Sequence, residues 1–172
     1  MVLGMSLQTY TAIHLIISLI GIGSGLLVVA GLLANKRLDN LTAIFLTTTV
    51  LTSVTGFFFP FKQVTPGIVL GVLSLIVLTV AIVARYSRRL IGGWRRTYVI
   101  AAIVSLYFNV FVLVVQSFEK VPTLHALAPT QKEGPFKIAQ LGVLIAFAVV
   151  GFMAVKRFRV EPVVVAKGMV AA

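Results

Sequence analysis

Residues 11–33 read TAIHLIISLIGIGSGLLVVAGLL and contain no Asp, Glu, Lys or Arg. An α-helix rises about 1.5 Å per residue, so a run of this length crosses the roughly 30 Å hydrocarbon core of a bilayer. Burying a charged side chain there is costly, which makes an uncharged run of this length a strong signal. The stretch therefore predicts a transmembrane helix.

Further stretches repeat this pattern of length and apolar composition. They are residues 41–59, 67–84, 98–117 and 137–155, with Lys137 at the edge of the last. Together with 11–33 they predict an all-α integral membrane bundle of five transmembrane helices. The second and third stretches are the shortest, so a re-entrant hairpin through Phe57–Phe61 is the alternative to two full crossings.

The composition supports a membrane location for the whole chain. Of its 172 residues, 59% are hydrophobic and 11% are charged, whereas globular proteins carry about 25% charged residues. No linker separates two parts, so residues 1–172 form a single predicted domain with a short tail at 160–172. Cysteine is absent, which excludes disulfides, thiolate catalysis and Cys-ligated metals.

The distribution of Lys and Arg predicts how the helices are oriented. Alternate connecting segments carry eleven basic residues on one side of the membrane and four on the other. Most of the fifteen Lys and Arg residues lie near residues 36, 85–96 and 156–167. Basic segments stay in the cytoplasm. We therefore expect the N-terminus outside, the C-terminus inside, and residence in the inner membrane if the source is bacterial. The first span lacks a positive leading segment and is expected to be a retained anchor.

Helix boundaries are also predicted from local sequence. Asp39 and Asn40 are suited to cap the second helix, and Thr65 followed by Pro66 is suited to begin the third. Gly134 and Pro135 begin the fifth in a similar way.

Small and polar residues form a stripe along the first span. His14, Ser18, Gly21 and Gly25 follow the i, i+4, i+7, i+11 spacing of one helix face. Gly21 and Gly25 form a GxxxG pair, which lets another helix approach closely. The stripe predicts that His14 points into the bundle.

Polar residues of the predicted spans fall mainly in the half nearer the outside. This candidate ligand-binding cluster comprises His14, Ser18, Thr52, Thr55, Asn109, Gln116 and Gln140. One interpretation is a set of interhelical hydrogen bonds, with His14 bound by Gln116 or a threonine. The other is an outward-facing pocket for a small polar molecule or a quinone head group.

The loop 121–136, VPTLHALAPTQKEGPF, carries the second histidine, His125. His14 and His125 are weak candidates for a metal or haem site, because two imidazoles are fewer ligands than a zinc centre requires. We expect no cofactor, with haem or quinone as the alternative. The prolines stiffen the loop, which suits a partner contact or a cover over the polar cluster.

The segment 85–96, RYSRRLIGGWRR, combines arginines with interfacial aromatic residues. This pattern is typical of contacts with anionic lipid head groups. The candidate residues for these contacts are Arg85, Arg88, Arg89, Trp94, Arg95 and Arg96. The net charge of +11 is concentrated in such short segments, so no nucleic-acid partner is expected.

No enzyme motif occurs, and the spans hold no carboxylate for proton coupling. The sequence therefore favours a non-catalytic accessory or assembly subunit that contacts lipids and other membrane subunits or further copies of itself. The first alternative is a small-solute or lipid transporter or channel that uses the polar cluster. The second is a redox protein that binds haem or quinone.

Overall fold

A computed structural model describes residues 2–61 and 66–159, and these residues are organised as helices without a strand. The elements are α1 (Leu7–Leu33), α2 (Asp39–Gly56), α3 (Pro66–Ile82), the π-helical turn η1 (Val83–Ser87), α4 (Gly93–Lys120), α5 (Pro122–Leu127) and α6 (Gly134–Arg157). The predicted all-α class is confirmed.

Among the described residues, four helical stretches are long and apolar enough to cross a membrane. These are Leu7–Leu33, Gly67–Ser87, Gly93–Lys120 and Gly134–Arg157. The sequence predicts five. The difference lies in α2, whose 18 residues include Asp39, Asn40 and many threonines, so it offers no 18-residue stretch as apolar as those of the four spans.

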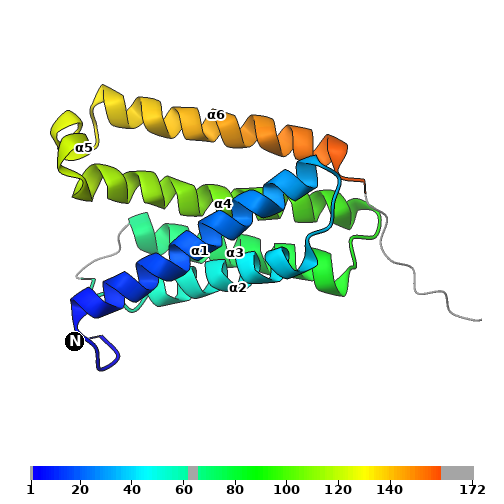
Figure 1. The fold of residues 1–172 in the computed structure, drawn as a ribbon, viewed down its shortest axis with the longest axis horizontal. Helices are drawn as coiled ribbons and strands as arrows, with labels where there is room; N and C mark the ends of the chain where they lie inside the picture. Colours follow the sequence, from blue (N-terminus) through cyan, green and yellow to red (C-terminus); the bar gives the residue numbers. More distant parts are fainter. Residues whose placement is uncertain (1, 62–65, 160–172) are drawn as a thin grey trace, which may run out of the picture.

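The helices pack as a bundle in which α1 runs obliquely across α2 and α4 (Figure 1). The segment between α1 and α2, the segment between α3 and α4, and the end of α6 all lie at one end of the bundle. We call it the basic end, because it carries Lys36, Arg37, Arg85, Arg88, Arg89, Arg95, Arg96, Lys156, Arg157 and Arg159. The opposite end, which carries α5, is called the α5 end.

The core lies among α1, α2, α3 and α4, with Phe45, Leu78, Tyr98 and Leu106 almost completely buried. The glycine stripe of α1 faces this core, as predicted. A Cβ atom added to Gly25 would lie 2.7 Å from Leu106 and 2.8 Å from Phe45. A larger residue would therefore push α1 away from its neighbours.

Helix α6 lies at the edge of the bundle, beside α4 (Figure 1). In its most apolar stretch 6% of the residues are buried, against 44% for α1 and 39% for α4. Within the described chain, Ala154 is the one buried residue of α6. Most of its apolar surface is therefore not covered by the rest of the described chain.

The predicted helix starts have mixed outcomes. Helix α6 begins at Gly134 with Pro135 in its first turn, as expected. The capping role of Asp39 is wrong: Leu38 is the N-cap residue of α2 and makes no side-chain capping bond. Thr65 lies outside the described residues. The loop 121–136 contains a short helix, α5, that the sequence analysis did not predict.

Candidate functional site

The half-buried His14 lies between α1 and the end of α2. Its Nδ1 atom is 2.8 Å from the Thr55 hydroxyl oxygen. The Tyr10 hydroxyl donates to the backbone carbonyl of Thr55 at 2.7 Å, and Phe59 packs edge-on against the rings of Tyr10 and His14. A threonine is thus the partner of His14, which was one of the two predicted partners. This group joins α1 to α2.

Asn109 lies in a second group, deeper in the bundle. Its amide nitrogen donates to the Thr49 hydroxyl at 3.3 Å. Gly21 lies against this pair, since an added Cβ atom would be 3.3 Å from Thr49 Oγ1 and 3.6 Å from Asn109 Nδ2. Gly21 and His14 are seven residues apart on α1, or about 10 Å along the helix axis. The two groups are therefore separate sites.

The other predicted cluster residues are distributed over the bundle. Ser18 donates to the His14 carbonyl at 2.7 Å, and Gln116 donates to Glu119 at 3.3 Å on the exposed side of α4. Gln140 of α6 donates to the Phe111 carbonyl at 3.2 Å, and its Oε1 atom is buried without a partner. The Thr52 hydroxyl is also buried without a partner. The geometry therefore divides the predicted cluster into separate contacts, of which those of Ser18 and Gln116 lie within a single helix.

Sequence reasoning about the site left out four residues that belong to these contacts: Tyr10, Thr49, Ser53 and Ser74. Tyr10 precedes the predicted first span by one position, and Ser74 of α3 accepts a hydrogen bond from Ser53 at 3.1 Å. Ser74 and Gly71 are three residues apart on α3 and form a stripe of small residues along one helix face, and Gly71 lies against Phe57. That stripe was the available signal.

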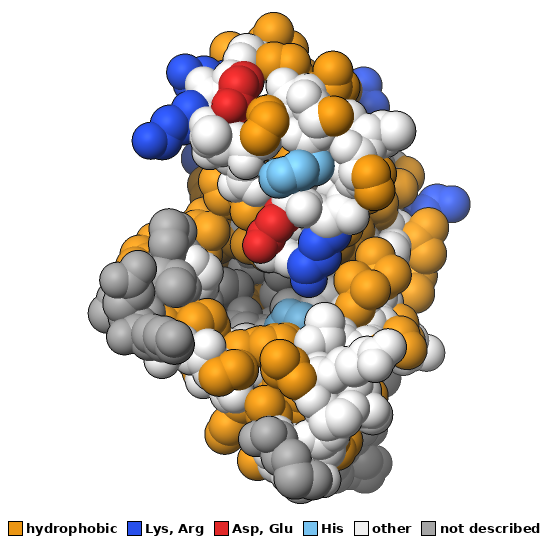
Figure 2. All heavy atoms as spheres, turned by 90° about the vertical axis from the view of Figure 1, so that its left-hand side faces the viewer, with side chains coloured by type: hydrophobic (Ala, Val, Ile, Leu, Met, Phe, Trp, Pro, Cys, Tyr) orange, Lys and Arg blue, Asp and Glu red, His pale blue; other side chains and the backbone are white. Residues whose placement is uncertain are grey.

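The α5 end is hollowed, and both histidines of the chain reach this face as two separate pale blue groups (Figure 2). His125 Nδ1 is 3.3 Å from the Phe118 carbonyl, while His14 binds Thr55. In the described part of the chain, no three His, Asp or Glu side chains come together to hold a metal ion.

Arg85 and Asp39 form an ion pair at the basic end. The Arg85 guanidinium binds Asp39 and lies 5.0 Å from the centre of the Tyr98 ring. Arg37 approaches the same carboxylate at 3.3 Å. The Arg85 side chain is 3% exposed, so its charge points inward from η1 instead of toward lipid head groups. Arg85 is therefore engaged inside the bundle, unlike the exposed Arg88, Arg89 and Arg96 of the predicted lipid-contacting set.

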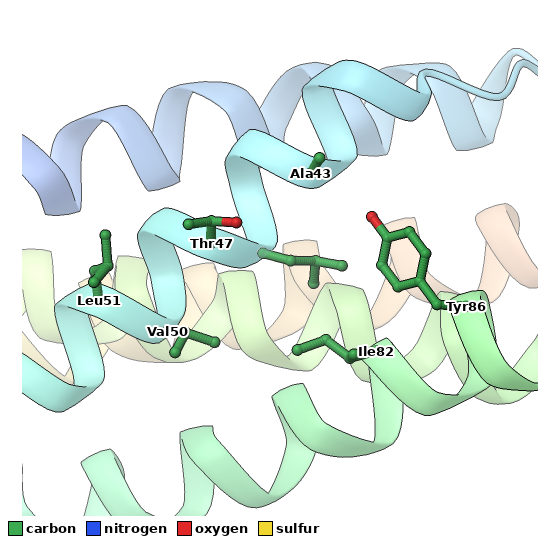
Figure 3. A pocket seen from close by; sticks show the side chains of 7 residues that line it. Ala43, Thr47, Val50, Leu51, Ile82 and Tyr86 are labelled. Carbon is green, nitrogen blue, oxygen red and sulfur yellow. The ribbon is translucent and has the colours of Figure 1, made fainter.

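An open apolar groove lies between α2 and the end of α3 (Figure 3). It holds about 400 Å³ and is lined by Ala43, Leu46, Thr47, Val50, Leu51, Ile82 and Tyr86. Its lining is largely hydrocarbon, with the hydroxyls of Thr47 and Tyr86 as its polar groups. Chemically it suits an acyl chain or an apolar side chain.

A second groove, of about 490 Å³, lies between the start of α4 and the end of α6. It is lined by Arg95, Arg96, Phe152, Val155, Lys156 and Arg159. We call it the basic groove. Arg95 and Arg96 belong to the predicted lipid-contacting set, whereas Lys156 and Arg159 do not.

The fold and these contacts define a helical membrane-protein bundle held together by interhelical polar contacts. No family model matches the chain, and neither a curated protein nor a solved structure is detectably similar to it.

Proposed function

We propose that this protein is a non-catalytic integral membrane subunit that binds another membrane-embedded helix through α6. In the proposed topology α2 also crosses the bilayer, giving five crossings with the N-terminus outside and the C-terminus inside. The excess of Lys and Arg at the basic end supports this orientation.

The polar side chains of the bundle support a structural role. His14 with Thr55, Asn109 with Thr49, and Ser53 with Ser74 each join two helices. Such hydrogen bonds contribute about 0.6–2 kcal/mol each, so several are needed to hold a bundle. The engagement of these polar groups between helices supports a role in packing.

The surface of α6 carries the proposal. Gly21, Gly25 and Gly71 each lie against a side chain of another helix, but a Cβ atom at Gly142 would meet no described atom within 4 Å. Ala146, one turn further along α6, is exposed as well. Gly142 and Ala146 thus form a small-xxx-small pair that faces out of the bundle. In membranes such pairs let a second helix pack closely.

Exposed apolar side chains flank this pair. Leu141, Ile145, Val149 and Phe152 are all more than half exposed. A partner helix seated on Gly142 and Ala146 would contact these neighbours. The proposed partner is therefore an apolar transmembrane helix, from another protein or from a second copy.

Gly23 of α1 provides a matched control. It too faces out of the bundle without a described neighbour within 4 Å, but Leu19 and Leu27 lie one turn away on either side. It therefore lacks the small-residue pair that close helix packing needs.

Purification in mild detergent with mass spectrometry of co-purifying proteins tests the proposal. We expect Gly142→Leu to reduce recovery of the partner or of the oligomer about tenfold or more, because the bulky side chain prevents close approach. We expect Gly23→Leu to leave recovery unchanged. A wild-type protein that runs as a lone monomer and recovers no partner would overturn the proposal.

The transporter and the haem- or quinone-binding redox protein remain alternative hypotheses. The separation of His14, Asn109 and Gln140 into different contacts gives a shared polar pocket less support. Loss of transport in a variant with both Asn109→Leu and Gln116→Leu would support the transporter. A haem band in the visible absorption spectrum of the purified protein would support the haem-binding redox protein.

A further inference from the structure

We propose that the basic groove binds the phosphate headgroup of an anionic lipid. This inference goes beyond the proposed helix-binding role, since it concerns the basic end of α6 and the start of α4 and does not depend on a protein partner.

The charge of the groove favours an anion. Four of its six lining residues are cationic: Arg95, Arg96, Lys156 and Arg159. Of the carboxylates in the described part of the chain, Asp39, Glu119 and Glu133, none lines the groove. Asp39 is bound by Arg85 and Arg37. Like charges held close together repel one another, so a bound anion would stabilise this arrangement.

Arg95, which lines the groove, has a donor that the bundle does not satisfy. Its Nη1 atom is buried and has no hydrogen-bond partner. Leaving a charged donor buried and unsatisfied is costly. A phosphate oxygen is a strong acceptor for guanidinium donors and would remove this cost.

The groove is also held in shape by its surroundings. The Arg159 backbone N–H donates to Asn35 Oδ1 at 2.6 Å, and the Arg159 Nε donates to the Lys156 carbonyl at 3.1 Å. Asn35 adopts a left-handed conformation, with φ of 55°, which asparagine tolerates better than most residues. Arg95 and Arg96 lie in the first turns of α4, where the helix dipole favours an anion.

The lining indicates a lipid and not a free phosphate. Phe152 and Val155 extend the groove along α6 toward the middle of its apolar stretch, and Phe152 is 62% exposed. The Lys156 ammonium lies 4.2 Å from the centre of the Phe152 ring. Charge at the helix end and hydrocarbon next to it match a headgroup and its acyl chain. Basic pockets between transmembrane helices commonly bind such lipids.

Fluorescence of Trp94, the single tryptophan of the chain, gives a direct measurement. Trp94 precedes Arg95 and is partly exposed. The full chain is reconstituted in zwitterionic vesicles, and a brominated anionic or brominated zwitterionic phospholipid is titrated as a quencher. We expect quenching by the anionic lipid at concentrations at least about tenfold lower.

Two double variants remove the same charge from the same end of the protein. Arg95→Gln with Lys156→Gln changes the basic groove, while Arg89→Gln with Arg157→Gln changes residues outside it. Each basic residue near a membrane surface contributes to attraction of anionic lipids, so both pairs lose some general attraction. We expect the groove variant to lose the anionic preference about tenfold, and the control to lose at most about threefold.

Equal losses in the two variants would show diffuse attraction and would overturn the proposal. In a second experiment, inorganic phosphate is added to the protein with the anionic lipid. If the phosphate reverses the quenching, the groove binds a free phosphate, and the assignment to a lipid is wrong. Circular dichroism checks folding. If Arg95→Gln with Lys156→Gln does not fold, Arg96→Gln with Arg159→Gln tests the same groove with the same criteria.

Discussion

The guanidinium of Arg85 binds the carboxylate of Asp39, which ties the π-helical turn after α3 to the first turn of α2. The arginine is buried and the aspartate is 64% exposed. A π-helical turn adds a residue to a helical turn and redirects the side chains near it. The π-helical turn contains the buried Arg85, whose charge points into the bundle, whereas the neighbouring Arg88 and Arg89 are exposed.

Removing the carboxylate should destabilise the bundle. Asp39→Asn leaves the buried Arg85 without its anionic partner, and we expect a loss of about 1–3 kcal/mol. The value is below that of a fully buried pair because Asp39 is largely solvated. Arg37→Gln removes the more exposed partner of Asp39 and should cost less than about 1 kcal/mol. Unfolding in a denaturing detergent measures both, and equal effects would contradict this assignment.

The contact of His14 with Thr55 should couple α1 to α2. In a double-mutant cycle with His14→Ala and Thr55→Val, we expect a coupling energy of about 0.6–2 kcal/mol. The pair Ser18→Ala and Thr55→Val is the control, since Ser18 bonds to the backbone of its own helix. A coupling near zero for His14 would show that the hydrogen bond does not stabilise the bundle.

The packing at Gly25 gives a stability prediction with an internal control. Gly25→Ala places a Cβ atom 2.7 Å from Leu106, and overpacking of this kind costs about 1–3 kcal/mol. Gly23→Ala meets open space and should be neutral or should stabilise α1 by up to about 1 kcal/mol. Thermal unfolding in detergent distinguishes the two. A stabilised Gly25→Ala would mean that α1 can move away from Phe45 and Leu106 without loss.

Acidification should loosen the start of α6. The Thr130 hydroxyl donates to Glu133 Oε1 at 2.7 Å and holds the pKa of this carboxyl below its ordinary value of 4.5. A lowered folded pKa means that the stabilising contribution is present above pH 4.5 and is lost as the pH falls through the folded value.

Amide hydrogen exchange measures this transition. The Thr130 and Lys132 N–H groups, which donate to Glu133, should lose protection only below pH 4.5. Thr130→Val should raise the pKa of Glu133 toward its ordinary value. An unchanged Glu133 titration in that variant would show that the hydroxyl is not the cause.

The proposed topology is testable because the chain has no cysteine. Single cysteines at Phe61 and Lys120 should react with an impermeant thiol reagent added outside the cell, whereas cysteines at Asn35 and Arg89 should react only after permeabilisation. If Phe61→Cys reacts only after permeabilisation, α2 does not cross the bilayer. Reaction of Arg89→Cys with the reagent added outside intact cells would show that the orientation is the opposite of the proposed one.

The sequence by itself determined the long helices and the face that α1 buries. Long uncharged runs leave the backbone no hydrogen-bonding partner in hydrocarbon except its own, so a helix follows wherever such a run occurs. The helical period then places Gly21 and Gly25 on one face, and that face lies in the core. Gly134 and Pro135 fixed the start of α6 because their effect on the backbone is local.

Only the tertiary structure decided which of these faces meet. Polar residues predicted in the same outer half, such as His14, Asn109 and Gln140, make separate contacts, because the position and crossing angle of each helix arise from packing over its whole length. Arg85 was predicted to contact lipid with its neighbours in the sequence, but a carboxylate 46 residues away draws it into the bundle. Helical periodicity specifies a direction for each side chain, and the partner in that direction depends on contacts between distant segments.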